Sequence, residues 1–120
     1  MANKEKGEVA LIAGDEIYII RFSSNALCEL EDASGVSAIE LANSLADESK
    51  FSMKSLRVML WAGLSGSKED ISLKDTGDII DQAGLGDVGM AIGKAFELAF
   101  PAPKDEDGQE PDAGKNKAAA

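Results

Sequence analysis

Two short runs of aliphatic and β-branched residues near the N-terminus constrain the fold most, because only two residues separate them. The runs are Gly7–Ala13 and Glu16–Phe22, and Gly14-Asp15 lies between them. Such runs are typical of strands, and a two-residue connection containing glycine supplies the tight turn of a β-hairpin. Since an isolated hairpin is only marginally stable in water, we expect this one to pack against helices.

The residues after the hairpin carry repeated helix start signals. A serine side chain caps a helix by accepting a hydrogen bond from a backbone N–H of the first turn. Serines precede four segments with helical apolar periodicity: Ser23 or Ser24, Ser37, Ser52 and Ser72. Glu40 and Asp75, each three residues after a serine, predict capping boxes at the second and fourth helices.

Glycine and proline predict where the helices end. Gly35 suits the left-handed residue after the first helix, and Gly84 ends the fourth. The third runs to about Leu64, and a fifth begins near Asp87 and is broken by Pro101. The expected inward faces are Leu27, Leu30 and Ala33/Ser34 in the first helix, and Ile39, Ala42 and Leu45/Ala46 in the second.

All three prolines lie in the last twenty residues, and from Pro101 to Ala120 there is no large apolar side chain. Such a segment cannot bury enough surface to offset the entropy lost on ordering. We therefore expect a flexible N-terminus at 1–6, one domain at 7–100 and a disordered, acidic tail at 101–120. One hairpin and about five short helices make the predicted fold α+β and α-dominated.

The charge balance excludes some classes of partner. The net charge is −10, whereas a nucleic-acid binder needs a basic face to displace counterions from phosphates. The acidity either keeps the protein soluble or matches a basic partner. No uncharged apolar run approaches the about 18 residues that span a bilayer. With no apolar leader-like segment at the start, we expect a protein of the bacterial cytoplasm that does not enter membranes.

The glycines of the fifth helix match a cofactor motif only in letters. Gly84-x-Gly86-x-x-Gly89 has the spacing of the dinucleotide fingerprint, which works only between a buried strand and a helix. Here the preceding residues alternate like a capped helix, so we interpret the glycines as a turn and expect no cofactor. Gly89 and Gly93 share a helix face and predict close approach of a neighbouring helix.

Acidic residues and the single cysteine give no catalytic site. Asp105–Gly108 resembles a calcium loop only faintly, because Gly114 stands where the bidentate Glu belongs. Glu29, Glu31 and Asp32 predict a solvent-facing stripe. Cys28 cannot form an internal disulfide and has no basic neighbour to activate it, so we expect a small buried or half-buried hydrophobe. We predict no enzymatic activity, no catalytic residue and no metal site.

The third helix is apolar nearly all round. Met53, Leu56, Leu60 and Leu64 form one stripe at helical spacing, and Trp61 projects to another side. Such a helix either lies centrally in the fold or covers a partner. Because tryptophan and methionine are favoured contact residues, the candidate partner-binding residues are Trp61, Met53, Met59 and Leu64.

Five features occur in a characteristic order. They are Met1-Ala-Asn-Lys with Gly7-Glu-Val, the hairpin, Ala26-Leu27-x-Glu29-Leu30-Glu31 with Gly35, Leu60-Trp61-Ala62-Gly63-Leu64, and Ser72-Leu73-x-Asp75-x-Gly77-x-Ile79-Ile80. Together they resemble the family named for a tail protein of gene transfer agents, which are phage-like particles. The resemblance covers about residues 1–100. It implies a protein of tail morphogenesis, in a family described both as a tail tube component and as a tail assembly chaperone.

A tube subunit needs a large sheet to form the ring wall, whereas this sequence offers one hairpin. The resemblance therefore implies a chaperone that binds the tape-measure protein, or other tail proteins, and keeps it soluble during tube assembly. Two alternatives stay open: a minor structural tail component retained in the virion, and an acidic protein-binding adaptor unrelated to tails. Self-association is compatible with each of them.

Overall fold

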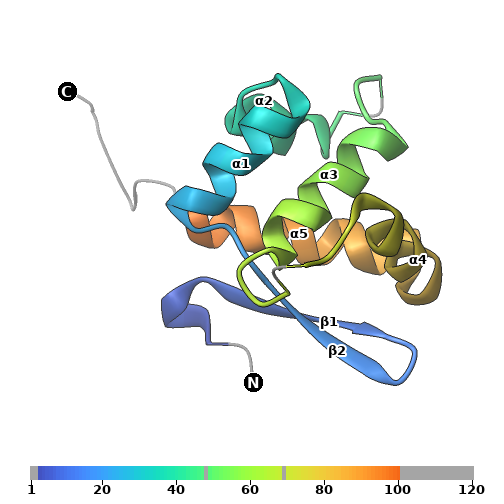
Figure 1. Cartoon of the computed structure of the whole chain (residues 1–120). Coiled ribbons are helices and arrows are strands. Elements are labelled where there is room, and N and C mark those ends of the chain that lie inside the picture. The colour runs from blue at the N-terminus through green and yellow to red at the C-terminus, as the bar shows by residue number, and fades with distance from the viewer. Residues whose placement is uncertain (1–2, 48, 69, 101–120) are drawn as a thin grey trace.

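The computed structural model describes residues 3–47, 49–68 and 70–100, and Figure 1 shows how their helices and strands are arranged. These residues form a 3-10 turn, a two-stranded antiparallel hairpin and five α-helices, in that order. The predicted α-dominated α+β fold is confirmed. The tail predicted for 101–120, with its calcium-loop-like residues, lies outside the described residues and stays a prediction.

The hairpin consists of β1 (Glu8–Ala13) and β2 (Glu16–Arg21), paired in register from Ala13↔Glu16 to Glu8↔Arg21. Gly14 in the turn has a φ of +62°, a conformation that glycine adopts without steric cost. A 3-10 turn, η1 (Lys4–Lys6), precedes β1. It forms because the Asn3 side chain caps it, accepting a hydrogen bond from the Glu5 backbone N–H at 2.9 Å.

The helices are α1 (Ser24–Ser34), α2 (Ala38–Ser44), α3 (Met53–Leu64), α4 (Leu73–Ala83) and α5 (Leu85–Ala99). Serine caps precede the first four of them, at Ser23, Ser37, Ser52 and Ser72. The capping box of Ser72 and Asp75 is complete. At α2 the Ser37 hydroxyl accepts from the Glu40 N–H, but the Glu40 carboxylate accepts from that hydroxyl instead of completing the box.

Helix α5 begins two residues earlier than predicted. Gly84, at φ +95°, is both the residue after α4 and the residue before α5, so no separate turn is needed between the two helices. Its backbone N–H donates to the Ile80 carbonyl at 2.9 Å and closes α4. The glycine-rich motif therefore follows a helix, as the sequence indicates, and has no buried strand before it.

Helix α3 lies at the centre of the domain. It contacts α1, α4, α5 and β2, and the side chains of Leu56, Met59, Leu60 and Leu64 are fully buried. The hairpin lies along one side of the helices, with β1 against α4 and α5 and β2 against α3 and α5 (Figure 1). Of the two readings of this apolar helix, central placement is thus the one observed for most of its residues.

A pair of stacked aromatic rings joins the end of the hairpin to the last helix. Phe22, which follows β2, stacks on Phe96 of α5 with ring centroids 4.2 Å apart and planes inclined by 3°. Both rings are buried. Aromatic pairs of this kind contribute about 0.5–1.5 kcal/mol beyond the burial of their area. The pair fixes the end of the hairpin on the last helix.

Two predicted faces differ from the structure. In α2 the predicted inward residue Ile39 is 61% exposed, whereas Ala38 and Leu41 are buried. The apolar residues of this short helix form two stripes, and packing on α1 selects the one that begins at Ala38. The close approach predicted at Gly89 and Gly93 is also wrong, because a Cβ at either position would meet no atom within 4 Å.

Candidate functional site

The four residues predicted to bind a partner occupy different environments. Met59 and Leu64 are fully buried in the core, which removes their side chains from the accessible surface. Met53, at the start of α3, is 51% exposed. Trp61 is half-buried against the core. Because successive helical residues project about 100° apart, the structure does not bring these four side chains together on one surface.

Trp61 positions the segment between α3 and α4. Its indole Nε1–H donates a hydrogen bond to the Ile71 carbonyl oxygen at 3.1 Å. Ile71 directly precedes Ser72, the cap of α4, so this bond fixes the approach of the chain to that helix. A buried or half-buried tryptophan usually needs such a partner for its N–H. The side chain is therefore an element of the fold that shapes the neighbouring surface.

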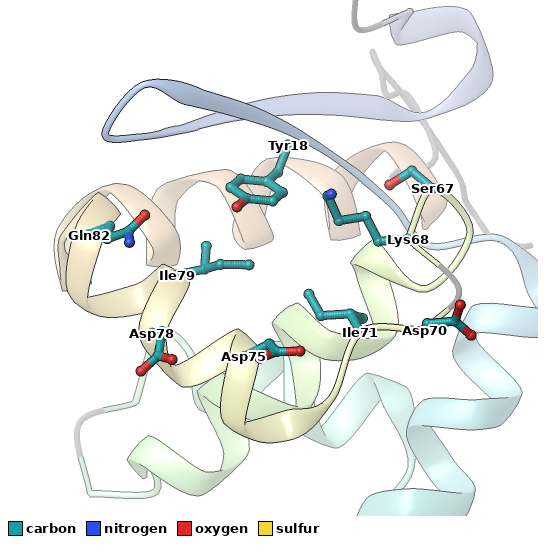
Figure 2. A pocket seen from close by; sticks show the side chains of 9 residues that line it. All are labelled: Tyr18, Ser67, Lys68, Asp70, Ile71, Asp75, Asp78, Ile79 and Gln82. Carbon is teal, nitrogen blue, oxygen red and sulfur yellow. The ribbon is translucent and has the colours of Figure 1, made fainter.

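That surface contains a cleft with a volume of about 550 Å³. It lies between β2, the segment after α3 and α4, and Figure 2 shows the Tyr18 ring facing Ile79 across it with Lys68 alongside. The lining residues are Tyr18, Ser67, Lys68, Asp70, Ile71, Asp75, Asp78, Ile79 and Gln82.

The cleft is polar and bears three carboxylates and one ammonium group. The Lys68 Nζ lies 5.4 Å from the centroid of the Tyr18 ring, within the range of a cation–π contact. Asp75 takes part in the α4 capping box, so one of the three carboxylates already serves the backbone. Over 3–47, 49–68 and 70–100, no three His, Cys, Asp or Glu side chains converge in a way that would hold a metal ion. The lining offers hydrogen-bonding groups and no pair of nucleophile and base.

In α1, Cys28 differs from the sequence prediction, and Glu31 makes a contact that was not predicted. Cys28 is exposed, not half-buried, because it lies about 200° around the helix from the buried Ala26 and Leu30. Glu29 and Asp32 are exposed, as the acidic stripe predicts. Glu31 does more, since its Oε2 accepts a hydrogen bond of 2.8 Å from the Ala38 N–H and so caps α2 from the preceding helix.

The hairpin also has an exposed apolar surface that was not predicted from the sequence. Ile12 and Ile17, which are cross-strand partners, are 65% and 61% exposed. Met90 of α5, which shares a hollow with Ile12, is 67% exposed. A signal was present in the sequence, because both strands are apolar at successive positions, whereas a hairpin with one face in water normally alternates.

Comparison with known proteins places this arrangement in a family. No curated protein and no solved structure matches the chain. No helix of the described residues is long and apolar enough to cross a membrane. Residues 6–100 match the family described as "Phage tail tube protein, GTA-gp10", which agrees with the predicted resemblance and with its extent. The match excludes the reading of the chain as an adaptor unrelated to tails. The chain belongs to this family of phage and gene transfer agent tail proteins.

Proposed function

We propose that this protein is a tail assembly chaperone that binds the tape-measure protein and keeps it soluble while the tail tube forms around it. The family supplies the setting, since its members are tail proteins. The chaperone role is more specific than membership of the family. It is supported by the shape of the sheet, by exposed apolar side chains and by the net charge.

The observation that carries the proposal is the size of the sheet. A subunit that forms the wall of a tube must contribute a large sheet to the ring. In the described part of this chain the sheet has two strands of six residues each, and the remaining elements are helical. A compact helical domain suits transient binding to a client better than a permanent place in a tube wall.

The surface supports the same role. Ile12, Ile17 and Met90 are large apolar side chains in water. Met53 borders a groove of about 380 Å³ between α3 and α4 whose lining is mostly charged. Clustered apolar side chains on the surface of a soluble domain commonly mark a site of protein binding. A net charge of −10 would keep a complex with an apolar client in solution. The proposed mechanism is coverage of apolar surface, without catalysis or cofactor.

Co-expression tests this proposal. The tape-measure protein encoded in the same tail cluster should be insoluble alone and soluble with this chain, and the chain should be absent from purified particles. A tape-measure protein that stays insoluble in the presence of this chain would contradict the chaperone role.

One observation favours a second role. The family description names a tail tube protein, which fits a minor structural component that stays bound to the tube. Purified particles separate the two roles, because a structural component would be present in them at a fixed ratio to the tube subunit. The partners in either case are other tail proteins.

A further inference from the structure

The register of the hairpin shows which backbone groups of β1 point away from β2, along the outer edge of β1. In a hairpin with a two-residue turn, the residues that flank the turn form a hydrogen-bonded pair, and such pairs alternate along the strands. The flanking pair is Ala13↔Glu16. In β1, therefore, the N–H and C=O groups of Glu8, Ala10 and Ile12 point away from β2.

Two hydrogen bonds confirm this direction. The Glu8 N–H donates to the Asn3 carbonyl at 2.9 Å, and this residue lies outside the β1–β2 ladder. On the opposite edge the Ser67 hydroxyl donates to the Ile19 carbonyl at 3.1 Å. The outer edge of β2 is thus partly covered by the segment after α3. On the outer edge of β1, Asn3 pairs with Glu8 only. No residue of the described chain forms a hydrogen bond with the outward backbone groups of Ala10 and Ile12.

The side chains beside this edge face water, yet they are apolar. Ala10, Ile12 and Ile17 lie on the face of the hairpin turned away from the core, and all three are exposed. An unpaired edge with exposed apolar residues is a template for another strand, and soluble proteins normally protect such edges with charges, prolines or a covering segment. No charged residue or proline stands between Val9 and Ala13.

A hollow runs between this edge and α5. It has two parts, of about 270 and 330 Å³, which share Val9, Ala10 and Lys94 and are therefore adjacent. Met90 lines the part near Ile12, and Leu98 lines the part near Glu8. The edge supplies backbone hydrogen-bonding groups on one side. On the other side, α5 supplies the apolar Met90, Ala91 and Leu98 together with the charged Asp87, Lys94 and Glu97. This is the pairing of features used when a peptide adds to a sheet.

We propose that the outer edge of β1 binds an extended segment of the tape-measure protein as a third strand, with apolar side chains at every second position of the segment. This inference rests on the proposed function for the identity of the client. The unpaired backbone groups select an extended chain, and the small Ala10 side chain leaves room for an apolar residue opposite it. The edge is short, because η1 ends it on one side and the turn at Gly14 on the other.

Two other occupants fit less well. Residues 101–120 contain no large apolar side chain with which to fill the hollow. A second copy of the chain, paired edge to edge, would bury one short strand, whereas stable dimers bury on the order of 1,200 Å² or more. A short segment of a client needs only the edge and the hollow.

Hydrogen exchange on the full-length protein tests the inference without mutation. In the free protein the Ala10 and Ile12 amides should exchange faster than the Leu11 amide, which points toward β2. In the complex purified after co-expression with the tape-measure protein, exchange at Ala10 and Ile12 should be slower than in the free protein by tenfold or more. Slow exchange of both amides in the free protein that rises with its concentration would identify a second copy as the occupant and overturn the inference. If both amides exchange slowly in the free protein and removal of residues 101–120 abolishes this protection, those residues occupy the edge and the inference is overturned.

A matched pair of proline variants isolates the edge. Ile12→Pro removes an outward N–H from β1, and Ile17→Pro removes an outward N–H from β2 while deleting the same kind of side chain. Proline is tolerated at such outward positions because it removes no ladder hydrogen bond. Both variants should fold, as judged by circular dichroism. Ile12→Pro should bind the tape-measure protein at least about tenfold more weakly than Ile17→Pro.

The outcomes separate this inference from the function on which it rests. If the tape-measure protein is bound and solubilised but the Ala10 and Ile12 amides stay unprotected, the strand site is wrong and the chaperone role stands. Equal binding by the two proline variants would also overturn the strand site. If the tape-measure protein is not bound at all, both proposals fall.

Discussion

Gly63 of α3 lies directly against Ile20 of β2. A Cβ added at position 63 would stand 2.7 Å from the Ile20 Cγ2 and 3.3 Å from the Phe22 Cζ, closer than carbon atoms approach without displacement. Ile20 is fully buried and β-branched, so its side chain has little freedom to move. The glycine thus allows the central helix to contact the hairpin.

This contact predicts opposite effects for two glycine-to-alanine substitutions. Gly63→Ala should lower the free energy of unfolding by about 1–2 kcal/mol, because overpacking exceeds the gain in helix propensity. Gly93→Ala, in the open interior of α5, should raise it by about 0.5–1 kcal/mol. Urea denaturation of both variants measures the difference. Equal stability of the two variants would show that the α3–β2 approach is looser than described.

The hydrogen bond from Trp61 predicts a graded loss of stability. Trp61→Phe keeps a ring but removes the donor to the Ile71 carbonyl, and should cost about 1 kcal/mol of unfolding free energy. Trp61→Ala also leaves a cavity and should cost about 3 kcal/mol. Chemical denaturation provides the measurement. An alanine variant that keeps its stability but loses binding of the tape-measure protein by about 2 kcal/mol or more would instead make Trp61 an interface residue.

The carboxylate of Glu31 predicts a specific effect on α2. Glu31→Ala removes the acceptor for the Ala38 N–H and should lower stability by about 0.5–2 kcal/mol, the usual cost of losing a helix cap. Glu29→Ala, an exposed position on the same helix, is the control and should stay within about 0.5 kcal/mol of the unmodified protein. Equal thermal shifts in the two variants would argue against the cap.

The composition of residues 101–120 predicts that they are dispensable for folding. Removing them should change the free energy of unfolding by no more than about 0.5 kcal/mol, as is usual for surface changes. Thermal denaturation by circular dichroism is a sufficient measurement. A truncated protein that loses cooperative unfolding would mean that this segment packs on the domain.

Local signals in the sequence predicted the elements well, whereas the faces of the helices depended on distant contacts. The serine caps and the left-handed Gly35 were predictable because a cap is formed within one turn. The face of α2 was not predictable, because Ile39 and Ala38 belong to competing stripes and the choice between them depends on packing against α1. Similarly, the spacing of Gly89 and Gly93 indicates a shared face but not whether a neighbour lies there.

The candidate site was predictable only in part, for the same reason. Residue type and helical position indicate Trp61 and Met53 as well as Met59 and Leu64, and only burial in the fold separates the first two from the last two. The edge of β1 depends on what the chain leaves uncovered, which no local pattern states. Its only trace in the sequence was the absence of polar alternation in the two strands.

The stacked rings of Phe22 and Phe96 have a consequence for synthesis of the chain. The hairpin is translated before the helices, and the stacking partner of Phe22 is made more than seventy residues later. Until α5 has been translated, the inner face of the hairpin lacks part of its cover, so the domain completes its fold late. Contacts between residues so far apart in sequence also slow folding, because the loop must close before the contact forms. The proposed client site uses both β1 and α5, so it is complete only after α5 has been made.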